Sequence, residues 1–219
     1  GSTGHEEIDG IAESLSAHAR PRAIWVSSVA SAAVNAQLED GLQRLFGLSP
    51  WFASTRARTG DLSNSYAEPA RLGVDRWLAM LGARARWQQS LCVVDVGSAM
   101  TIDLVSASGQ HEGGYIIPGP ALMERALLLD TDRVRFDEDV DYQLAPGTST
   151  AEAVRHGIAL AQAGAVLAVT DLGQRTLVLT GGGATVLEQL LGQRGFLIPD
   201  LVFEGLAVLA EAEGLVNHV

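Results

Sequence analysis

The chain has 219 residues, of which 47% are hydrophobic and 19% are charged, and its formal net charge is −11 at pH 7. A chain of this kind can bury a sizeable core in one large or two small domains. The acidic balance argues against nucleic-acid binding, which needs clustered Lys and Arg. No apolar run approaches the ~18 residues that a membrane span needs, and no signal-peptide pattern opens the sequence. We therefore expect a soluble, cytoplasmic protein.

Residues that bind metals or form disulfides are sparse. Cys92 is the single cysteine and lies in an apolar run, so we expect a buried small hydrophobe and no disulfide. The five histidines are scattered without the spacing of a ligand set. A structural zinc site is therefore not expected.

The first third of the chain predicts helices and strands in alternation. Residues 6–18 carry apolar side chains at helical spacing, 23–29 form a β-rich apolar run, and 32–48 are helical by pattern. A strand followed by a helix indicates an α/β protein with a mostly parallel sheet. Residues 56–69 are polar and rich in turn formers, which predicts a loop.

The middle of the chain predicts a helix and then three strands. Residues 74–90 have an apolar helical face, and short aliphatic runs at 91–94, 101–105 and 112–117 predict strands. Tight turns between them, one at Ser108 and Gly109, predict antiparallel pairing.

The last part predicts two further helices and a strand that runs into glycines. Residues 120–129 read as a helix, and an acidic irregular segment follows. Thr150 has the residue type of an N-cap for a helix over 151–169. A strand over 176–180 enters a triglycine before a helix over 185–191. The triglycine fits a nucleotide cradle or a close-packed turn equally well, and no Lys of a Walker loop follows it.

The turn after residues 91–94 carries the groups that bind phosphate and cations. Asp95 leaves a buried strand, Gly97 allows a tight turn, and Ser98 and Thr101 offer hydroxyl groups. A plain hairpin with an Asx-type turn would use the same residues. Further along, a diglycine at Gly113 fits a β-bulge as well as a close backbone approach to a ligand.

Six motifs in order resemble the type III pantothenate kinase family, whose members are also known as Bvg accessory factor-like proteins. The resemblance covers about residues 64–205 and rests on Asn64-Ser65-Tyr66, Leu72-Gly73-Val74-Asp75-Arg76-Trp77, Asp95-Val96-Gly97-Ser98-Ala99-Met100-Thr101, Gly113-Gly114-Tyr115-Ile116-Ile117-Pro118-Gly119, Gly147 to Val154, and Thr180-Gly181-Gly182.

The resemblance implies an α/β fold with two ribonuclease H-like domains of the acetate and sugar kinase, actin and chaperone-ATPase superfamily, over residues 1–90 and 91–219. Family members open with a strand and an Asp-x-Gly-Asn-Thr/Ser turn around the ATP phosphates. The printed sequence opens with Gly1-Ser2-Thr3 and lacks that hairpin, so we expect this segment alone to bind ATP poorly. Ser98 also stands where the family usually has Thr, which keeps the hydroxyl.

The implied reaction is phosphorylation of pantothenate by ATP. Asp75 matches the family's proton acceptor, although an acid in the first turn of a helix is also common for its interaction with the helix dipole. Arg76 would bind the pantothenate carboxylate with its planar fork, or lie solvated on the helix face. The family's substrate-contacting positions fall on Tyr66, Gly73, Val74, Asp75, Arg76 and Thr150.

The nucleotide side of the implied site falls on two residues. Asp95 matches the family's monovalent-cation ligand, for K⁺ or NH₄⁺, and Ser98 matches an ATP-contacting hydroxyl, with Mg²⁺ carried by the nucleotide. The diglycine is expected to let the backbone approach the ligand. The family implies a homodimer with the substrate site near the subunit interface. A catalytically weak relative that acts as a regulatory accessory protein is the alternative function.

Overall fold

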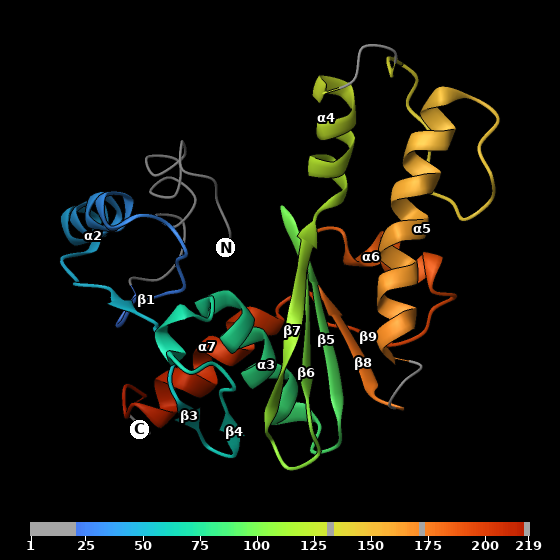
Figure 1. Cartoon of the computed structure of the whole chain (residues 1–219). Coiled ribbons are helices and arrows are strands. Elements are labelled where there is room, and N and C mark those ends of the chain that lie inside the picture. The colour runs from blue at the N-terminus through green and yellow to red at the C-terminus, as the bar shows by residue number, and fades with distance from the viewer. Residues whose placement is uncertain (1–20, 131–133, 171–173, 217–219) are drawn as a thin grey trace.

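A five-stranded mixed sheet is the centre of the computed structural model, which describes residues 21–130, 134–170 and 174–216 (Figure 1). The strand order is β7-β6-β5-β8-β9. The antiparallel strands and β8 are confirmed, but the sheet is half antiparallel rather than mostly parallel. The helix predicted over 6–18 lies outside the described residues. The strand bounds are β5 Leu91–Val96, β6 Ala99–Val105, β7 His111–Pro118, β8 Thr176–Thr180 and β9 Phe196–Leu197.

Helices cover both faces of this sheet, and strand alternation sorts the core between them. Leu91 and Val93 of β5 pack with α3 (Val74–Arg86) and α7 (Leu201–Ala212), whereas Cys92 and Val94 pack with α5 (Thr150–Thr170) and α6 (Ala184–Leu190). Successive side chains of a strand point to opposite faces, so this sorting follows from the pleat. The expected burial of Cys92 is confirmed.

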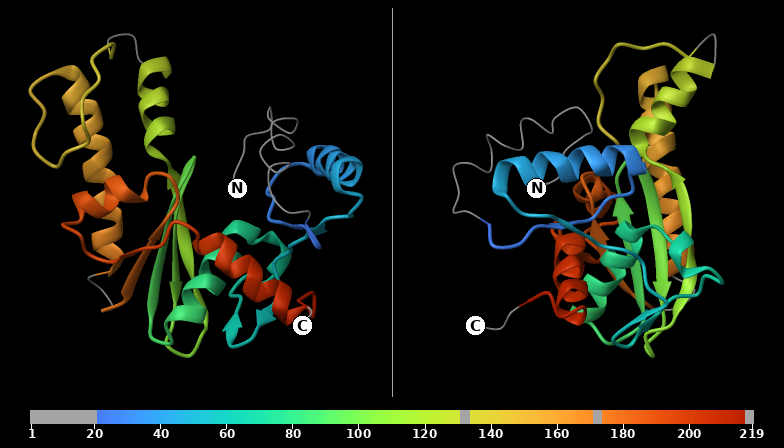
Figure 2. Two further views of the ribbon diagram at one scale, coloured as in Figure 1. Left: turned by 180° about the vertical axis from the view of Figure 1, so that it is seen from behind. Right: turned by 90° about the vertical axis from the view of Figure 1, so that its left-hand side faces the viewer.

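A smaller group of elements precedes α3. β1 (Trp25–Val26) pairs in parallel with β2 (Trp51–Phe52), and α2 (Ala32–Phe46) connects them. The predicted loop over 56–69 contains a short hairpin, β3 (Arg58–Thr59) and β4 (Leu62–Ser63), before the 3₁₀ turn η1 (Pro69–Arg71). Figure 2 shows α2 standing away from the sheet, beyond α7.

The helices α4 (Pro120–Asp130) and α5 extend beyond the end of β7 (Figure 1). Arg155 of α5 binds Glu124 of α4 at 3.1 Å and also Asp139 of the segment between the helices, at 2.5 Å. Through these two ion pairs, Arg155 links α5 to α4 and to the segment that connects them.

The start of α5 corrects the expectation for Thr150. The helix begins at Thr150, and the Ser149 hydroxyl accepts the Glu152 N–H at 3.2 Å, so Ser149 is the N-cap. The Glu152 carboxylate reaches back to the Thr148 N–H at 2.7 Å, in the manner of a capping box. Thr150 is therefore the first helical residue.

The composition of α5 differs from the expectation that no segment is long and apolar enough to cross a membrane. By length and composition alone, its 21 residues could do so. A third of the stretch is buried in the fold. Ala163 and Val166 pack against the sheet, which gives the apolar residues of this helix a place in the protein core.

Candidate active site

The register of the sheet brings two aspartates to the face that α3 covers. Asp95 lies two residues after Val93 on β5, and Asp103 lies two before Val105 on β6, so both share the face of those core residues. Asp95 is opposite Thr101, and Asp103 is opposite Val93. The first turn of α3 supplies Asp75 and Arg76 to the same region.

Asp75 and Asp95 form a pair of carboxylates at the end of β5. Both side chains are half-buried. Burial, and then the charge of Asp75, raise the pKa of Asp95 to about 6. Within the described residues, the Asp95 carboxylate has neither a hydrogen-bond donor nor a basic partner. Ionisation of both carboxylates therefore needs a compensating positive charge or a shared proton.

The backbone around Asp75 holds its carboxylate in place. Asp75 Oδ1 accepts the Arg76 N–H at 2.8 Å. Gly73 is the N-cap residue, and a Cβ there would come within 2.5 Å of the same oxygen. The glycine at position 73 therefore leaves room for the Asp75 side chain.

The triglycine after β8 packs directly on the Asp95 turn. Gly181 has φ +89°, and a Cβ there would meet the Asp95 carboxylate and the Val96 backbone. The Gly183 N–H donates to the Val96 carbonyl at 2.9 Å. The close-packed alternative for the triglycine is thus confirmed, and the carboxyl ends of the parallel strands β5 and β8 meet here. In open α/β sheets this edge is where ligands bind.

Ser98 forms the exposed tip of the β5–β6 hairpin. Its carbonyl accepts the Gly119 N–H at 3.0 Å, which ties the hairpin to the end of β7. Its hydroxyl has no protein partner within the described part of the chain. The hydroxyl is thus available to a ligand at the same edge as Asp95.

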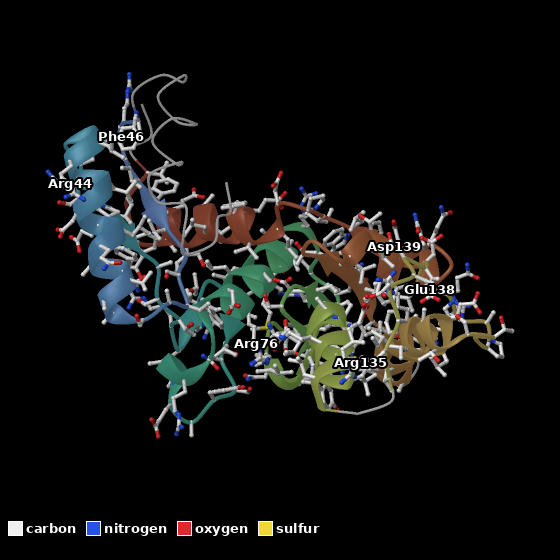
Figure 3. The ribbon with its side chains drawn as sticks, turned by 90° about the horizontal axis from the view of Figure 1, so that it is seen from above. Arg44, Phe46, Arg76, Arg135, Glu138 and Asp139 are labelled. Carbon is white, nitrogen blue, oxygen red and sulfur yellow. The ribbon has the colours of Figure 1, made fainter. Side chains whose placement is uncertain are left out.

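Arg76 is paired inside the protein rather than solvated on the helix face. Its Nε and Nη2 donate to the two oxygens of Asp103 at 2.9 and 2.6 Å, and its side chain is 5% exposed. Burial lowers the pKa of Arg76, and the bond and charge of Asp103 outweigh that effect, so the net pKa is raised. Figure 3 shows Arg76 in the middle of the molecule, between Arg44 on α2 and Glu138 near α5.

The remaining Arg76 donor contacts Tyr66. Nη1 lies 3.1 Å from the Tyr66 hydroxyl, and the guanidinium carbon is 5.9 Å from the ring centre. Asn64 holds the loop, because its Oδ1 accepts the Tyr66 N–H at 2.9 Å and its Nδ2 donates to the Pro69 carbonyl at 3.3 Å. The structure therefore joins two of the predicted substrate residues by a hydrogen bond.

The diglycine on β7 forms a β-bulge and leaves space beside the Arg76–Asp103 pair. The pairing of β6 and β7 shifts its register beside Gly113, which has φ +109°, so the β-bulge alternative is confirmed. A Cβ at Gly114 would lie 2.6 Å from Asp103 Oδ1 and 2.8 Å from Arg76 Nη2. Glycine at this position makes room for the buried ion pair.

Val74 and Thr150 lie apart from these contacts. Val74 is the first residue of α3, and its side chain is buried in the core. Thr150 is exposed and lines a cavity of about 1010 Å³ between α4 and α5, whose lining is largely apolar and includes none of the other predicted site residues. In the described residues of this chain, the predicted substrate positions are therefore divided between two places.

Sequence reasoning gave no role to two residues that complete the Arg76 environment, Asp103 and His111. Asp103 pairs with Arg76, and His111 Nε2 lies 3.0 Å from Asp103 Oδ1. Ser65, which the motif Asn64-Ser65-Tyr66 includes, has its Oγ 3.0 Å from His111 Nδ1. Asp103 carried a signal in strand alternation, which puts it on the same face as Thr101 and hence beside the phosphate-type turn.

The fold and the site define a class. Three antiparallel strands, β5 to β7, are followed by β8, which is parallel to β5, and by β9, which is parallel to β8. This is the ribonuclease H-like arrangement of the actin-like kinases and ATPases. A carboxylate pair at the carboxyl edge of such a sheet suits phosphoryl transfer from a nucleotide.

Comparisons with known proteins identify the family within this class. The sequence profile described as type III pantothenate kinase matches residues 2–172. The type III pantothenate kinase of Hahella chejuensis is 38% identical over 191 residues, which are 86% of this chain and 78% of that protein. The enzyme of Marinobacter nauticus is 40% identical over 198 residues, or 86% and 79%. The chain belongs to the type III pantothenate kinase family and is a kinase.

A solved structure supports the fold. A Campylobacter jejuni protein described as a conserved putative Baf family transcriptional activator superposes with a TM-score of 0.64 over 95% of this chain and 89% of that one. The two sequences are 23% identical, so this likeness concerns the fold alone.

Proposed function

We propose that this protein phosphorylates pantothenate with ATP to give 4'-phosphopantothenate, the first step of coenzyme A biosynthesis, and that Asp75 is the general base. Family membership supports the overall reaction. The observation that carries the assignment to this site is the half-buried Asp75 carboxylate beside Asp95 at the carboxyl edge of the sheet. The accessory-protein alternative has no observation in its favour.

Asp75 would accept the proton of the pantothenate hydroxyl as its oxygen attacks the γ-phosphorus of ATP. A carboxylate within hydrogen-bond reach is sufficient for this role. The hydrogen bond from the Arg76 N–H fixes one oxygen of Asp75, which leaves the other oxygen for the substrate. The β–γ phosphoanhydride bond breaks, and ADP leaves with the bridging oxygen.

Arg76 and Tyr66 would bind the pantothenate carboxylate. Three of the five Arg76 N–H groups are engaged by Asp103 and Tyr66, so two remain for an anion. Gly73 would form part of the pocket wall, and its lack of a side chain leaves space for the Asp75 carboxylate. Val74, whose side chain is buried in the core, would complete the wall of this pocket with Gly73.

Charge in the site argues for K⁺ or NH₄⁺ at Asp95. All 15 basic residues of the sequence are Arg, so no Lys can counter the ATP phosphates. The half-buried Asp95 carboxylate has the chemistry of a cation ligand, and Ser98 offers a hydroxyl to the nucleotide beside it. A monovalent cation there would neutralise charge, and Mg²⁺ would arrive with ATP. Asp95 fits this role because a cation would offset the desolvation of its charged form.

The α4–α5 region supports a homodimer. Leu122 and Leu129 of α4 and Leu160 of α5 are exposed by 39%, 71% and 61%, beside the apolar cavity that Thr150 lines. A second copy would cover these side chains and add its surface to the cavity. On this proposal Thr150 contacts pantothenate in the dimer rather than in one subunit.

The proposal includes two ribonuclease H-like units over 1–90 and 91–219 and a cytoplasmic location. The α3 and α7 helices pack closely across the boundary between these units. Gly205 of α7 allows this contact, because a Cβ there would overlap the Leu78 backbone of α3. Substrate bound near Asp75 would therefore lie where the two units join.

Product formation tests the proposal. Native protein is incubated with ATP, Mg²⁺, K⁺ and pantothenate, and 4'-phosphopantothenate is measured by mass spectrometry. We expect product that depends on ATP and on pantothenate. Pantothenate binding by calorimetry without any product would support the accessory-protein alternative instead.

A further inference from the structure

We propose that His111 is a positioning residue for pantothenate binding, because it fixes the guanidinium of Arg76 through Asp103. This inference rests on the proposed function, and it adds a residue outside the substrate motifs. His111 is the first residue of β7 and is completely buried, with Asp103 2% and Arg76 5% exposed. Three polar side chains that are this little exposed to solvent must find their hydrogen-bond partners in one another.

A series of hydrogen bonds leads from the exposed Ser65 to the buried Arg76. The Ser65 hydroxyl lies 3.0 Å from His111 Nδ1, and His111 Nε2 lies 3.0 Å from Asp103 Oδ1. The same Oδ1 accepts from Arg76 Nη2 at 2.6 Å, while Oδ2 accepts from Nε at 2.9 Å. Each link depends on the one before it, so the orientation of the Asp103 carboxylate sets the plane of the guanidinium.

The contacts also assign the protons. Asp103 is paired with Arg76 and can only accept, so His111 Nε2 carries a hydrogen. Nδ1 faces the Ser65 hydroxyl, which can donate to it or accept from it. Both ring nitrogens of His111 are therefore engaged by named partners.

The ring of His111 supports the other ligand-side residue as well. Tyr66 and His111 stack with ring centres 6.2 Å apart and planes inclined by 18°. Tyr66 in turn bonds Arg76 Nη1. His111 therefore reaches both residues assigned to the pantothenate carboxylate, one through Asp103 and one through its ring.

Arg76 is only 5% exposed, and the exposed residue nearest its guanidinium on β7 is Gly114, where a Cβ would lie 2.8 Å from Nη2. Because glycine has no side chain, a small anionic ligand would approach Arg76 past this residue, without displacing Asp103. Loss of His111 would let the Asp103 carboxylate rotate, which would misalign the two N–H groups that remain for the substrate.

The test compares substrate binding with turnover in the native protein and in His111→Leu. We expect KM and the calorimetric Kd for pantothenate to rise about 10-fold, the loss that one hydrogen bond to a charged group carries. We expect kcat and the KM for ATP to stay within about 2-fold, because Asp75 and the phosphate turn are untouched. His111→Gln keeps a donor and an acceptor and should restore most of the affinity.

Two further variants keep the test decisive if His111→Leu folds poorly. Ser65→Ala removes the exposed end of the chain and should raise the pantothenate Kd by about 2- to 5-fold. Asp61→Asn is the control, since it weakens another ion pair of a buried Arg outside the pocket, in which Arg84 Nη2 and Nε both donate to Asp61 Oδ2, at 2.6 and 3.0 Å. That control should leave the pantothenate Kd unchanged.

Nitrogen chemical shifts of His111 give a readout that does not depend on activity. We expect the proton on Nε2, where Asp103 accepts it, and a change in these shifts on adding pantothenate. Shifts that do not respond to pantothenate, or native affinity in both His111→Leu and Ser65→Ala, would overturn the inference. Absence of any pantothenate binding by the native protein would overturn the proposed function itself, and the inference with it.

Discussion

Asp95 and Asp103 lie on the same face of the sheet, yet their surroundings differ in charge. Asp103 is almost fully buried and accepts from Arg76 and His111, while Asp95 is half-buried beside a second carboxylate and has no partner in the described residues. A paired carboxylate fixes geometry, whereas an unpaired one recruits a cation or a proton. The comparison indicates that binding and chemistry are divided between neighbouring positions of one face.

The strongest way to break this comparison is to remove the paired carboxylate. Asp103→Leu leaves the Arg76 charge buried and uncompensated, so we expect the free energy of unfolding to fall by about 3–5 kcal/mol. Urea denaturation measures it. Asp61→Leu should cost less, because Arg84 keeps the Ala107 carbonyl at 2.9 Å and other acceptors. An equal fall in the free energy of unfolding in both variants would contradict the claim that Asp103 is the main partner of the Arg76 charge.

The second prediction concerns the chemical step. Asp75→Asn keeps the oxygen that accepts the Arg76 N–H but cannot take a proton, so kcat should fall by about 10²-fold or more. Folding and pantothenate affinity should be nearly native. Steady-state kinetics with calorimetry checks both, and full activity in the variant would remove Asp75 from the mechanism.

The unpaired carboxylate should affect stability in the opposite direction. The folded-state pKa of Asp95, about 6, is above the ordinary value of 3.8, so ionisation favours the unfolded chain as pH rises through that range. Without K⁺ or nucleotide, we expect Asp95→Asn to be more stable than the native protein by about 1–2 kcal/mol above pH 6.5, after allowing for partial solvent exposure. Below about pH 4 the difference should vanish. A native protein more stable than the variant at pH 8 would contradict this account.

The smallest predicted effect is on cation preference. Activity should be several-fold higher in K⁺ or NH₄⁺ than in Na⁺ at matched ionic strength, because a larger, weakly hydrated ion is easier to desolvate. Asp95→Ala should abolish the preference and most of the ATP affinity. Equal activity in Na⁺ and K⁺, with a variant like the parent, would show that the Asp95 turn is only a hairpin.

The sequence predicted the elements that have local causes. The strand over 176–180 has the predicted bounds, and the three antiparallel strands follow from short aliphatic runs and tight turns. The helix predicted to end near Ser90 stops at Arg86, where Trp87 turns extended and Arg84 donates forward to the Gln89 carbonyl. Such a side-chain contact leaves no periodic signal.

The site was predictable where motifs carry it and not where distant segments meet. Asp75, Arg76 and Tyr66 were found by resemblance and lie together. His111 read as one of several scattered histidines, because its partners are 46 and 8 residues away in the sequence. Strand pairing and the loop after β4 bring them together, and no spacing rule encodes that meeting.

The division between binding and chemistry is tested most directly by assaying Asp75→Asn and His111→Leu side by side for 4'-phosphopantothenate formation over a range of pantothenate concentrations. We predict that kcat falls about 10²-fold with little change in KM in the first variant. In the second, KM should rise about 10-fold with little change in kcat. A fall in kcat alone in both variants, or a rise in KM alone in both, would contradict the separation of the two roles.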